Sequence, residues 1–514
     1  MFESQESTPW HQSITSLVAT ALLLPPVGLV LLWARRQTPT RTKLVASLGI
    51  ILLGAGYFAL YRIWSKSSAN EAHYAALEEH RARQQAEAMQ QSAANNPAAA
   101  AVGTSPQPGQ PGVAPVAGSS PETASAHVTR NYWTNFRGPN RDGRYDEMAV
   151  LTNWPAQGLP LVWKQPVGLG YASFTIADGR AYTIEQRRRQ EAVAAYDINT
   201  GRELWSQAWN AEYTDSTGDG PRTTPTWDDG RLYALGATGE LRCLDAKTGA
   251  VNWAKNILKD NQAGNLSWAM AASPLVVDDK VIVLPGGSNG KSVVAYNKLT
   301  GTPVWKSQDD PQAYVSPMLV NLAGRRQILV VSAFRVFGLA PENGALLWSQ
   351  TWDTDMGINV SQPIMVDKNR FFISSGYGKG AALVEVTGSG NSFTARSIWE
   401  NINMKNKFNS SVLHEGHVYG LDEGILTCVD VNTGARKWKG GRYGYGQVLL
   451  ASGHLIVMSD SGELALVKAS PAEYSEVARF AALAGKTWNY PAIAGGRLFV
   501  RNATEMAAYK ITAE

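Results

Sequence analysis

Cysteine and histidine are scarce in this chain, and their scarcity limits the chemistry that its residues can support. The 514 residues include two cysteines, Cys243 and Cys428, and seven scattered histidines. The cysteines are not neighbours, and neither belongs to a CxxCH haem site or to a pair with metal-ligand spacing. The sequence also contains no GxSxG elbow, no HExxH motif and no P-loop. Common signatures of hydrolases, zinc proteases and nucleotide-dependent enzymes are therefore missing, and no catalytic residue or metal ligand is assigned.

Lysine and arginine are missing before the first apolar segment, although they are frequent directly after it. Segments 14–33 and 44–63 are both apolar and long enough to cross a hydrocarbon core of roughly 30 Å. The loop between them, ARRQTPTRTK, carries three arginines and one lysine, so the positive-inside rule places it in the cytoplasm. We expect residues 1–66 to form a two-pass membrane anchor with both termini outside, in which Pro25-Pro26 kinks the first span.

Two connectors follow the anchor. Residues 67–92 are rich in Ala, Glu, Gln and Arg and predict an exposed helical stalk, with a poor coiled-coil seam as the alternative. Residues 93–128 are almost wholly Ala, Pro, Gly, Ser, Thr, Gln and Val and predict a disordered linker. Residues 129–514 then form a tethered domain. The net charge of +4 gives no reason to expect nucleic-acid binding.

A short motif of a strand end, a tight turn and a tryptophan recurs six times between residues 195 and 438. Two copies read AYDINTGRELW (195–205) and CLDAKTGAVNW (243–253), whereas the copy at 384–399 is expanded. The Asp side chain of the turn can accept hydrogen bonds from backbone amides, the Gly tolerates positive φ, and the tryptophan can fill the space between units. A period of this size is typical of a toroidal all-β array. The structural repeat anchors are Trp163, Trp205, Trp253, Trp305, Trp348, Trp399 and Trp438.

The spacing of these anchors, completed by Phe480 in a degenerate unit, predicts an eight-bladed β-propeller. Seven blades are the alternative if the unit before Phe480 is not a full blade. The segment LPLVWK (159–164) has no strand before it, whereas the last unit, AAYKITAE (507–514), lacks its tryptophan strand. We expect the N-terminal strand to complete the final blade and close the ring. Cys243 and Cys428 fall at equivalent positions of different blades, so we expect two buried thiols and no disulfide.

The side chains that line the centre of a propeller come from the starts of its innermost strands. Those stretches include PRTTP (221–225), YVSP (314–317) and FNSS (408–411), and they contain no carboxylate. Acidic residues do occur in EYTDSTGDG (212–220) and WDTDMG (352–357), which we expect to be solvated loops on the rim. The candidate channel-lining residues are Tyr171, Arg222, Tyr314, Gln362, Asn409, Tyr445 and Asn489.

The unit Ala/Leu-x-Asp-x-x-Thr-Gly-x-x-x-Trp resembles the pyrroloquinoline-quinone-type (PQQ-type) repeat, and the resemblance runs from Trp163 to the C-terminus. The segment YWTNFRGPNRDGRYDE (132–147) looks like the start of BamB-like bacterial periplasmic propellers, and we expect its FRGPNRDG turns to cap the ring near its closure. This family has two branches. One comprises quinoprotein alcohol and sugar dehydrogenases, which bind the quinone and a calcium ion in the central channel. The other comprises cofactor-free propellers that bind proteins or peptides.

The dehydrogenase branch implies residues that this sequence does not offer at the expected places. Its alcohol-oxidising members carry a vicinal Cys-Cys disulfide, a general-base Asp and oxygen ligands for calcium, although the glucose-oxidising type lacks the cysteine pair. We therefore predict a periplasmic interaction scaffold without a cofactor, whose partners are envelope proteins or peptides. Because no cysteine precedes residue 243, a lipoprotein anchor is not expected, and the two helices place the protein in a bacterial inner membrane. The alternative is a pyrroloquinoline-quinone-dependent dehydrogenase with Ca²⁺ that oxidises alcohols or sugars.

Overall fold

The chain divides into two compact units, Met1–Ala76 and Leu77–Glu514. The computed structural model describes residues 14–35, 38–95, 132–390 and 392–512. The expected linker, 93–128, lies outside these residues apart from its first three positions, which end a helix.

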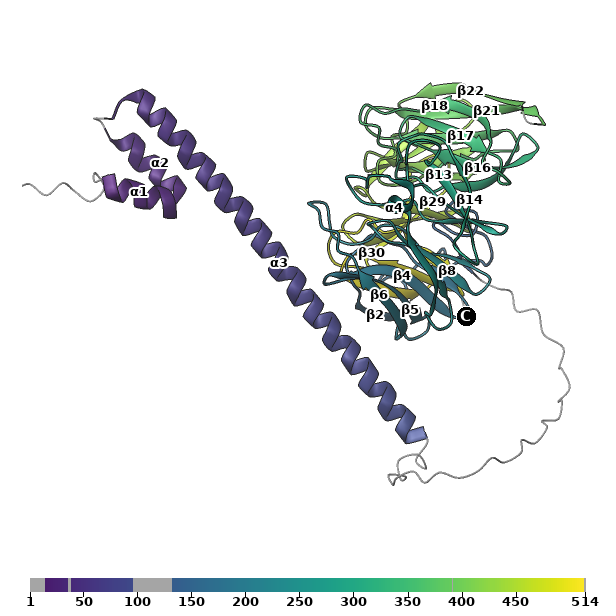
Figure 1. Cartoon of the computed structure of the whole chain (residues 1–514), viewed down its shortest axis with the longest axis horizontal. Helices are drawn as coiled ribbons and strands as arrows, with labels where there is room; N and C mark the ends of the chain where they lie inside the picture. The colour runs from purple at the N-terminus through teal and green to yellow at the C-terminus, as the bar shows by residue number, and fades with distance from the viewer. Residues whose placement is uncertain (1–13, 36–37, 96–131, 391, 513–514) are drawn as a thin grey trace, which may run out of the picture. The chain divides into compact units, whose positions relative to one another are not determined.

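The N-terminal unit is helical (Figure 1). α1 spans Ile14–Leu23 and α2 spans Pro25–Ala34, so the expected first span is divided into two short helices. The prolines explain the break, because a proline has no backbone N–H with which to continue the ladder of α1. α3 spans Thr40–Asn95 and joins the expected second span and the stalk in one helix. Among the described residues, α3 is the one helix that is long and apolar enough to cross a membrane.

The C-terminal unit is the expected eight-bladed β-propeller (Figure 1). It contains eight sheets of four antiparallel strands, and one of them has a fifth, parallel strand, β1 (Arg144–Tyr145). The unit before Phe480 is a full blade, so the seven-bladed alternative is wrong. Blade 1 contains β3 (Thr175–Ala177), β4 (Arg180–Arg187), β5 (Gln190–Asp197) and β6 (Glu203–Asn210), and blade 2 contains β7 (Thr226–Asp228), β8 (Arg231–Leu235), β9 (Glu240–Asp245) and β10 (Val251–Asn256). Blade 3 contains β11 (Leu275–Val277), β12 (Lys280–Val283), β13 (Val293–Asn297) and β14 (Pro303–Ser307), and blade 4 contains β15 (Met318–Leu322), β16 (Arg325–Val331), β17 (Arg335–Leu339) and β18 (Leu346–Thr351). Blade 5 contains β19 (Ile364–Met365), β20 (Arg370–Ser375), β21 (Gly380–Ser389) and β22 (Ser392–Asn401), and blade 6 contains β23 (Val412–His414), β24 (His417–Asp422), β25 (Ile425–Asp430) and β26 (Arg436–Arg442). Blade 7 contains β27 (Gln447–Ala451), β28 (His454–Met458), β29 (Glu463–Lys468) and β30 (Glu476–Ala481). A short helix, α4 (Ile257–Asn261), follows β10.

The last blade is assembled from both ends of the propeller sequence. Blade 8 contains β31 (Ala492–Ala494), β32 (Arg497–Arg501), β33 (Glu505–Lys510) and, outermost, β2 (Leu161–Pro166). β2 pairs antiparallel with β33 and brings Trp163 opposite Ala508. The N-terminal strand therefore closes the ring as expected, and it covers an edge that would otherwise expose unpaired backbone groups.

The repeat tryptophans lie between neighbouring blades. Trp205 on β6 donates from its indole Nε1 to the carbonyl oxygen of Ala246 in blade 2, at 3.2 Å. The same bond to the next blade is made by Trp163, Trp253, Trp305, Trp399 and Trp438. Trp348 differs, since its Nε1 donates to Gln327 Oε1 of its own blade at 2.6 Å. The blade that follows Trp348 carries the expanded repeat, which lacks the usual turn.

Candidate binding site at the centre of the propeller

Residues 132–145, called the plug segment below, cross the ring and close one end of its central channel. Trp133 forms an antiparallel bridge with Ile176 of blade 1, and the segment ends in β1 (Arg144–Tyr145), which pairs parallel with β27 of blade 7. The FRGPNRDG turns lie between these two points. We expected these turns to lie near the point of closure. In the structure they also contact the starts of inner strands in several other blades.

Arg137 and Arg141 bind the plug segment to those inner strands. Their side chains have almost no exposed surface. Arg137 donates to the carbonyl oxygens of Ser410 and Ser411 in blade 6, at 3.2 and 2.7 Å. Its guanidinium also lies 5.1 Å from the centre of the Tyr490 ring. These bonds satisfy carbonyl groups at the start of an inner strand, where no neighbouring strand supplies a donor.

Arg141 makes equivalent bonds to blades 3 and 4. Its Nη1 donates to Ser273 O at 3.2 Å and to Pro317 O at 2.9 Å, and its Nη2 donates to Pro274 O. Burial lowers the pKa of Arg141 to about 9, so the side chain is still a cation at neutral pH. Carbonyl dipoles replace the water around this cation. The plug segment is therefore bonded to both sides of the ring.

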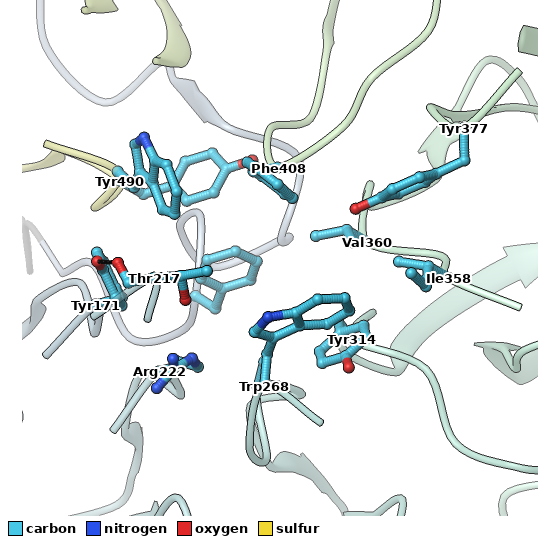
Figure 2. Close-up of a pocket in the computed structure, with 13 residues that line it drawn as sticks. Tyr171, Thr217, Arg222, Trp268, Tyr314, Ile358, Val360, Tyr377, Phe408 and Tyr490 are labelled. Atoms are coloured by element: carbon cyan, nitrogen blue, oxygen red, sulfur yellow. Dashed lines mark hydrogen bonds between the residues drawn. The ribbon is translucent and has the colours of Figure 1, made fainter. Parts of the chain in front are cut away.

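An aromatic pocket of about 200 Å³ lies against the plug segment (Figure 2). Phe136 of the plug segment packs edge to face on Tyr490 with 4.9 Å between ring centres, and Trp268 lies 5.9 Å from Tyr314. Most of the lining comes from the loops that lead into the innermost strands, so the pocket is at the centre of the ring. It is lined by Phe136, Tyr171, Thr217, Arg222, Trp268, Ala271, Tyr314, Ile358, Val360, Tyr377, Phe408, Trp488 and Tyr490.

One side of the pocket is formed by the acidic loop at 212–220. Asp215 Oδ1 accepts a hydrogen bond from the backbone N–H of Thr217, and its Oδ2 pairs with Arg222 Nη2 at 2.5 Å. Burial opposes the ionisation of Asp215, but the bonds from Thr217 and the charge of Arg222 hold its pKa below its usual range. The loop was expected to be solvated, and for Asp219 this is wrong, because that residue is only 5% exposed.

Two lysines lie against aromatic rings at the pocket. Lys486 Nζ is 3.5 Å from the centre of the Trp488 ring and donates to the carbonyl oxygen of Thr217. Lys407 Nζ is 5.2 Å from the ring centres of both Tyr377 and Tyr445. Within the described chain, Lys407 forms no ion pair, and its ammonium finds an acceptor in the Tyr445 hydroxyl at 3.5 Å. A cation held among rings in this way is stabilised by their negative faces.

The candidate residues from the sequence separate into two groups. Tyr171, Arg222 and Tyr314 line the pocket, and Tyr445 packs against Phe408 at 5.0 Å between ring centres. The three amides of the set lie deeper. Gln362 Nε2 donates to Ser316 O at 2.7 Å, Asn489 Nδ2 donates to Ala172 O at 2.8 Å, and Asn409 Oδ1 accepts from Asn406 at 2.9 Å. Each of these amides is buried, and none belongs to the pocket lining. Gln362 and Asn489 join neighbouring blades, whereas Asn409 bonds within its own loop.

Sequence reasoning missed most of the aromatic wall. Trp268, Phe408 and Trp488 directly precede or begin inner-strand stretches, so aromatic residues at those places were a usable signal. Tyr377 offers no such signal, because it lies in the turn between β20 and β21. Phe136 belongs to a segment that reaches the channel only through the tertiary structure.

The residues around the pocket do not fit the quinone and calcium ion that the dehydrogenase branch implies. No carboxylate is among the lining residues, and no group of three or more His, Cys, Asp or Glu that could hold a metal ion occurs in the described part of the chain. Cys243 and Cys428 are free and buried in blades 2 and 6. A cavity of roughly 150 Å³ holds one benzene molecule, so a pocket of about 200 Å³ is small for a fused multi-ring quinone.

A protein-family model described as "Outer membrane protein assembly factor BamB" matches residues 189–440. These residues contain all six motif tryptophans and run from blade 1 to blade 6. The propeller belongs to the PQQ-type repeat family. The resemblance inferred from the repeat motif is thereby confirmed.

Relatives of this PQQ-type propeller include proteins of both branches. Outer membrane protein assembly factor BamB of Bordetella pertussis is 21% identical over 375 residues, which cover 64% of this chain and 92% of that protein. Quinohemoprotein alcohol dehydrogenase ADH-IIG of Pseudomonas putida is 27% identical over 173 residues, which cover 32% of this chain and 23% of that enzyme. The chain thus spans less than a third of the length of the curated dehydrogenases that it matches.

The solved structure of quinohemoprotein alcohol dehydrogenase ADHIIG from Pseudomonas putida HK5 superposes on this PQQ-type propeller with a TM-score of 0.54. The two share 14% sequence identity over 75% of this chain and 81% of that chain. At this identity the likeness shows the fold alone.

Proposed function

We propose that this protein is a membrane-tethered periplasmic scaffold that binds protein or peptide segments of the cell envelope and carries no cofactor. The observation that carries the proposal is the construction of the central pocket, which is closed at one end by the plug segment and walled by aromatic side chains. Aromatic pockets of this kind suit the burial of anchor residues from a partner. Redox chemistry with a bound calcium ion would need carboxylate ligands, and the lining includes none.

The tether in this proposal is α3. Its apolar part follows the basic loop that contains Arg35 and Lys43, and the positive-inside rule assigns that loop to the cytoplasm. The propeller, which follows α3 in the chain, then faces the periplasm from the inner membrane. The BamB relative, whose name describes an assembly factor of outer membrane proteins, supports a partner within the envelope.

In-cell photo-crosslinking tests the scaffold function. A photoreactive amino acid is placed in the full-length protein at Tyr377 or Phe408, at the pocket, and at Val251 on the outer strand β10 as the reference. We expect polypeptide adducts from the two pocket positions in excess over the reference. Absence of adducts from the pocket positions and from further exposed positions around the ring would contradict the proposal.

The alternative function is a quinone-dependent alcohol or sugar dehydrogenase, which the local similarity to the Pseudomonas putida enzyme favours. It is tested by adding pyrroloquinoline quinone and Ca²⁺ to the purified full-length protein and measuring binding together with dye-linked alcohol and aldose oxidation. Saturable binding accompanied by turnover would overturn the scaffold function.

A further inference from the structure

We infer that the pocket takes one aromatic side chain from a peptide segment in which an acidic residue neighbours the aromatic one. This inference rests on the proposed function and names the kind of segment that the scaffold would select.

The size of the pocket limits its occupant to about one ring. The pocket has a volume of about 200 Å³, whereas a buried cavity of roughly 150 Å³ holds one benzene molecule. The difference leaves room for little more than the short aliphatic stem of a side chain. The plug segment lies across the inner end and contributes Phe136 to the lining, which favours the entry of a side chain over the passage of a chain.

The walls of the pocket favour an aromatic ring over an aliphatic group. Trp268 and Tyr314 present rings from one side and Phe408 from another, and Ile358 and Val360 fill the wall between them (Figure 2). Rings at these positions offer both faces and edges, and aromatic pairs gain energy from edge-to-face and offset contacts beyond their buried area. A guest ring therefore finds complementary partners that an aliphatic side chain would not use.

Charge favours an acidic neighbour to that ring. On the side of Arg222, the cation is paired with Asp215 at 2.5 Å. On the side of Tyr377, Lys407 is half-buried among rings and forms no ion pair in the described residues, although its charge helps to lower the pKa of Glu423. A carboxylate one residue from the guest ring would complete an ion pair with Lys407 in surroundings that are drier than bulk water.

Peptide binding to the full-length protein in nanodiscs tests the inference. The probes are fluorescent twelve-residue peptides of one glycine-serine background with the centre Asp-Phe-Asp, Asn-Phe-Asn, Lys-Phe-Lys or Asp-Ala-Asp. We expect Asp-Phe-Asp to bind about tenfold more tightly than Asp-Ala-Asp, because the ring supplies most of the buried area. It should bind about threefold more tightly than Asn-Phe-Asn at low salt, and this preference should fade as salt is added.

Two variants assign these preferences to the pocket. Lys407→Gln should remove the preference for Asp-Phe-Asp over Asn-Phe-Asn and leave the preference for Phe over Ala, whereas Lys437→Gln on the exposed face of β26 should change neither. Val360→Phe should weaken every Phe-containing peptide by filling the cavity. Equal binding of the Phe and Ala peptides, or Lys-Phe-Lys binding as tightly as Asp-Phe-Asp, would overturn the inference. If these peptides fail while crosslinks still form at Tyr377, the scaffold function survives and only this choice of segment is wrong.

A second inference concerns the N-terminal unit and rests on independent observations. We propose that α1 and α2 form a re-entrant hairpin that enters the membrane from the cytoplasmic side, so that α3 alone crosses it. Each of the two helices has ten residues, and at 1.5 Å per residue it is about 15 Å long, roughly half of the hydrocarbon core. Neither helix can cross the membrane by itself.

The two short helices pack against each other and against the start of α3. A Cβ atom at Gly28 would lie 2.5 Å from the Cα of Ala21, so α2 touches the backbone of α1 and needs glycine at this place. Ala21 and Leu32 form a buried cluster with Ile50 of α3. Trp33 Nε1 also donates to Ser47 Oγ at 2.9 Å. These contacts fold the first apolar segment back on itself.

The turn of the hairpin leaves no backbone N–H unpaired, which is one of the conditions for a break inside lipid. Leu24 N donates to Thr20 O at 2.8 Å, and the N–H groups of Val27 and Gly28 both donate to Leu24 O, at 2.9 and 3.1 Å. The two residues between them, Pro25 and Pro26, have no N–H to satisfy. The proline pair thus breaks the helix without exposing a donor.

A hairpin places the N-terminus in the cytoplasm, on the opposite side from the two-pass arrangement expected from hydropathy. Single cysteines test this in full-length protein in which Cys243→Ser and Cys428→Ser remove the native thiols. With an impermeant maleimide on intact spheroplasts, we expect Ser120→Cys to be labelled and Ser7→Cys to be labelled only after permeabilisation. Replacing Pro25, Pro26 and Gly28 by leucine should create a continuous span and expose Ser7→Cys. Labelling of Ser7→Cys without those replacements, or protection of Ser120→Cys, would overturn the hairpin topology.

Discussion

Trp205 of blade 1 lies on Gly249 of blade 2, and this contact links the recurring tryptophan of one repeat to the recurring glycine of the next across a blade boundary. A Cβ at Gly249 would be 2.5 Å from Cε3 of the tryptophan ring. The glycine also has φ of +77°, which side chains adopt rarely. The Gly of one repeat is therefore required both by its own turn and by the tryptophan of the preceding repeat.

Gly249→Ala should destabilise the propeller by more than the cost of its positive φ. We expect a loss of about 1 kcal/mol from the backbone and a further loss of about 2 kcal/mol from the displaced indole. Gly230→Ala is the matched control, because Gly230 has φ of +74° and no atom within 4 Å of its Cβ position. Thermal unfolding of the full-length protein, followed by near-UV circular dichroism, measures both. Equal losses for the two variants would show that the contact with Trp205 is not important.

Arg141→Met should destabilise the plug segment. The substitution removes the donor from the carbonyl oxygens of Ser273 and Pro317, whereas Pro274 O still accepts from Thr226 Oγ1. The two buried acceptors left unpaired cost about 2 kcal/mol or more in total. Limited proteolysis near residue 140 and the melting temperature should both report this loss. Arg436→Gln, at an exposed position of β26, should leave both unchanged. An unaltered melting temperature for Arg141→Met would contradict the structural role of this arginine.

Glu191 should make the stability of the propeller depend on pH. Burial raises the pKa of this β5 carboxyl from 4.5 to about 7, against the opposing effect of the Ala237 N–H, which donates to Oε1 at 2.8 Å. Because the folded pKa is raised, the protonated side chain stabilises the fold below pH 4.5, and this stabilisation is lost as the pH rises through 7. The loss is about 3 kcal/mol at most.

Glu191→Gln should remove that slope between pH 4.5 and 7. Unfolding free energies measured at intervals across this window, with Glu473→Gln at an exposed position as the control, would test the effect. A slope that persists in Glu191→Gln would have to come from other groups.

The two thiols should be unreactive in the folded protein. Burial raises the pKa of Cys428 to about 12 and also raises that of Cys243, so little thiolate forms at pH 8. We expect Ellman's reagent to react slowly with the native protein and to titrate two thiols after unfolding in guanidinium chloride. Fewer than two thiols in the unfolded, unreduced chain would indicate an oxidised cysteine.

The repeat made most of the propeller predictable because its signals are local. An Asp that bonds the amides of its own turn, a Gly at positive φ and a Trp at constant distance from both act within a few residues of each other, as around Asp245 and Trp253. The closure of the ring by β2 also followed from local patterns, because one unit lacked its last strand and another lacked its first. The anchor was less predictable. Hydropathy marked two apolar segments and the proline pair indicated a kink in the first, yet neither showed that this segment forms two short helices divided at Leu24.

Residues in the pocket were only partly predictable because their roles depend on contacts between distant parts of the chain. Tyr171, Arg222 and Tyr314 reach the pocket from the inner-strand starts. Asn489 and Gln362 start in similar positions, but each turns its amide to a carbonyl of a neighbouring blade. The choice between these orientations depends on which acceptor lies across the blade boundary, and the sequence does not describe that geometry.

The sequence by itself determined the repeat and its outer tryptophan anchors, and it favoured eight blades over seven, since these signals depend on residues that are close in the chain. Only the tertiary structure decided that the plug segment closes the channel. Arg137 and Arg141 stand four positions apart in the sequence, but their acceptors lie in blades 3, 4 and 6. Those acceptors come together only when the ring is complete, because a propeller creates its centre by bringing every blade to one axis.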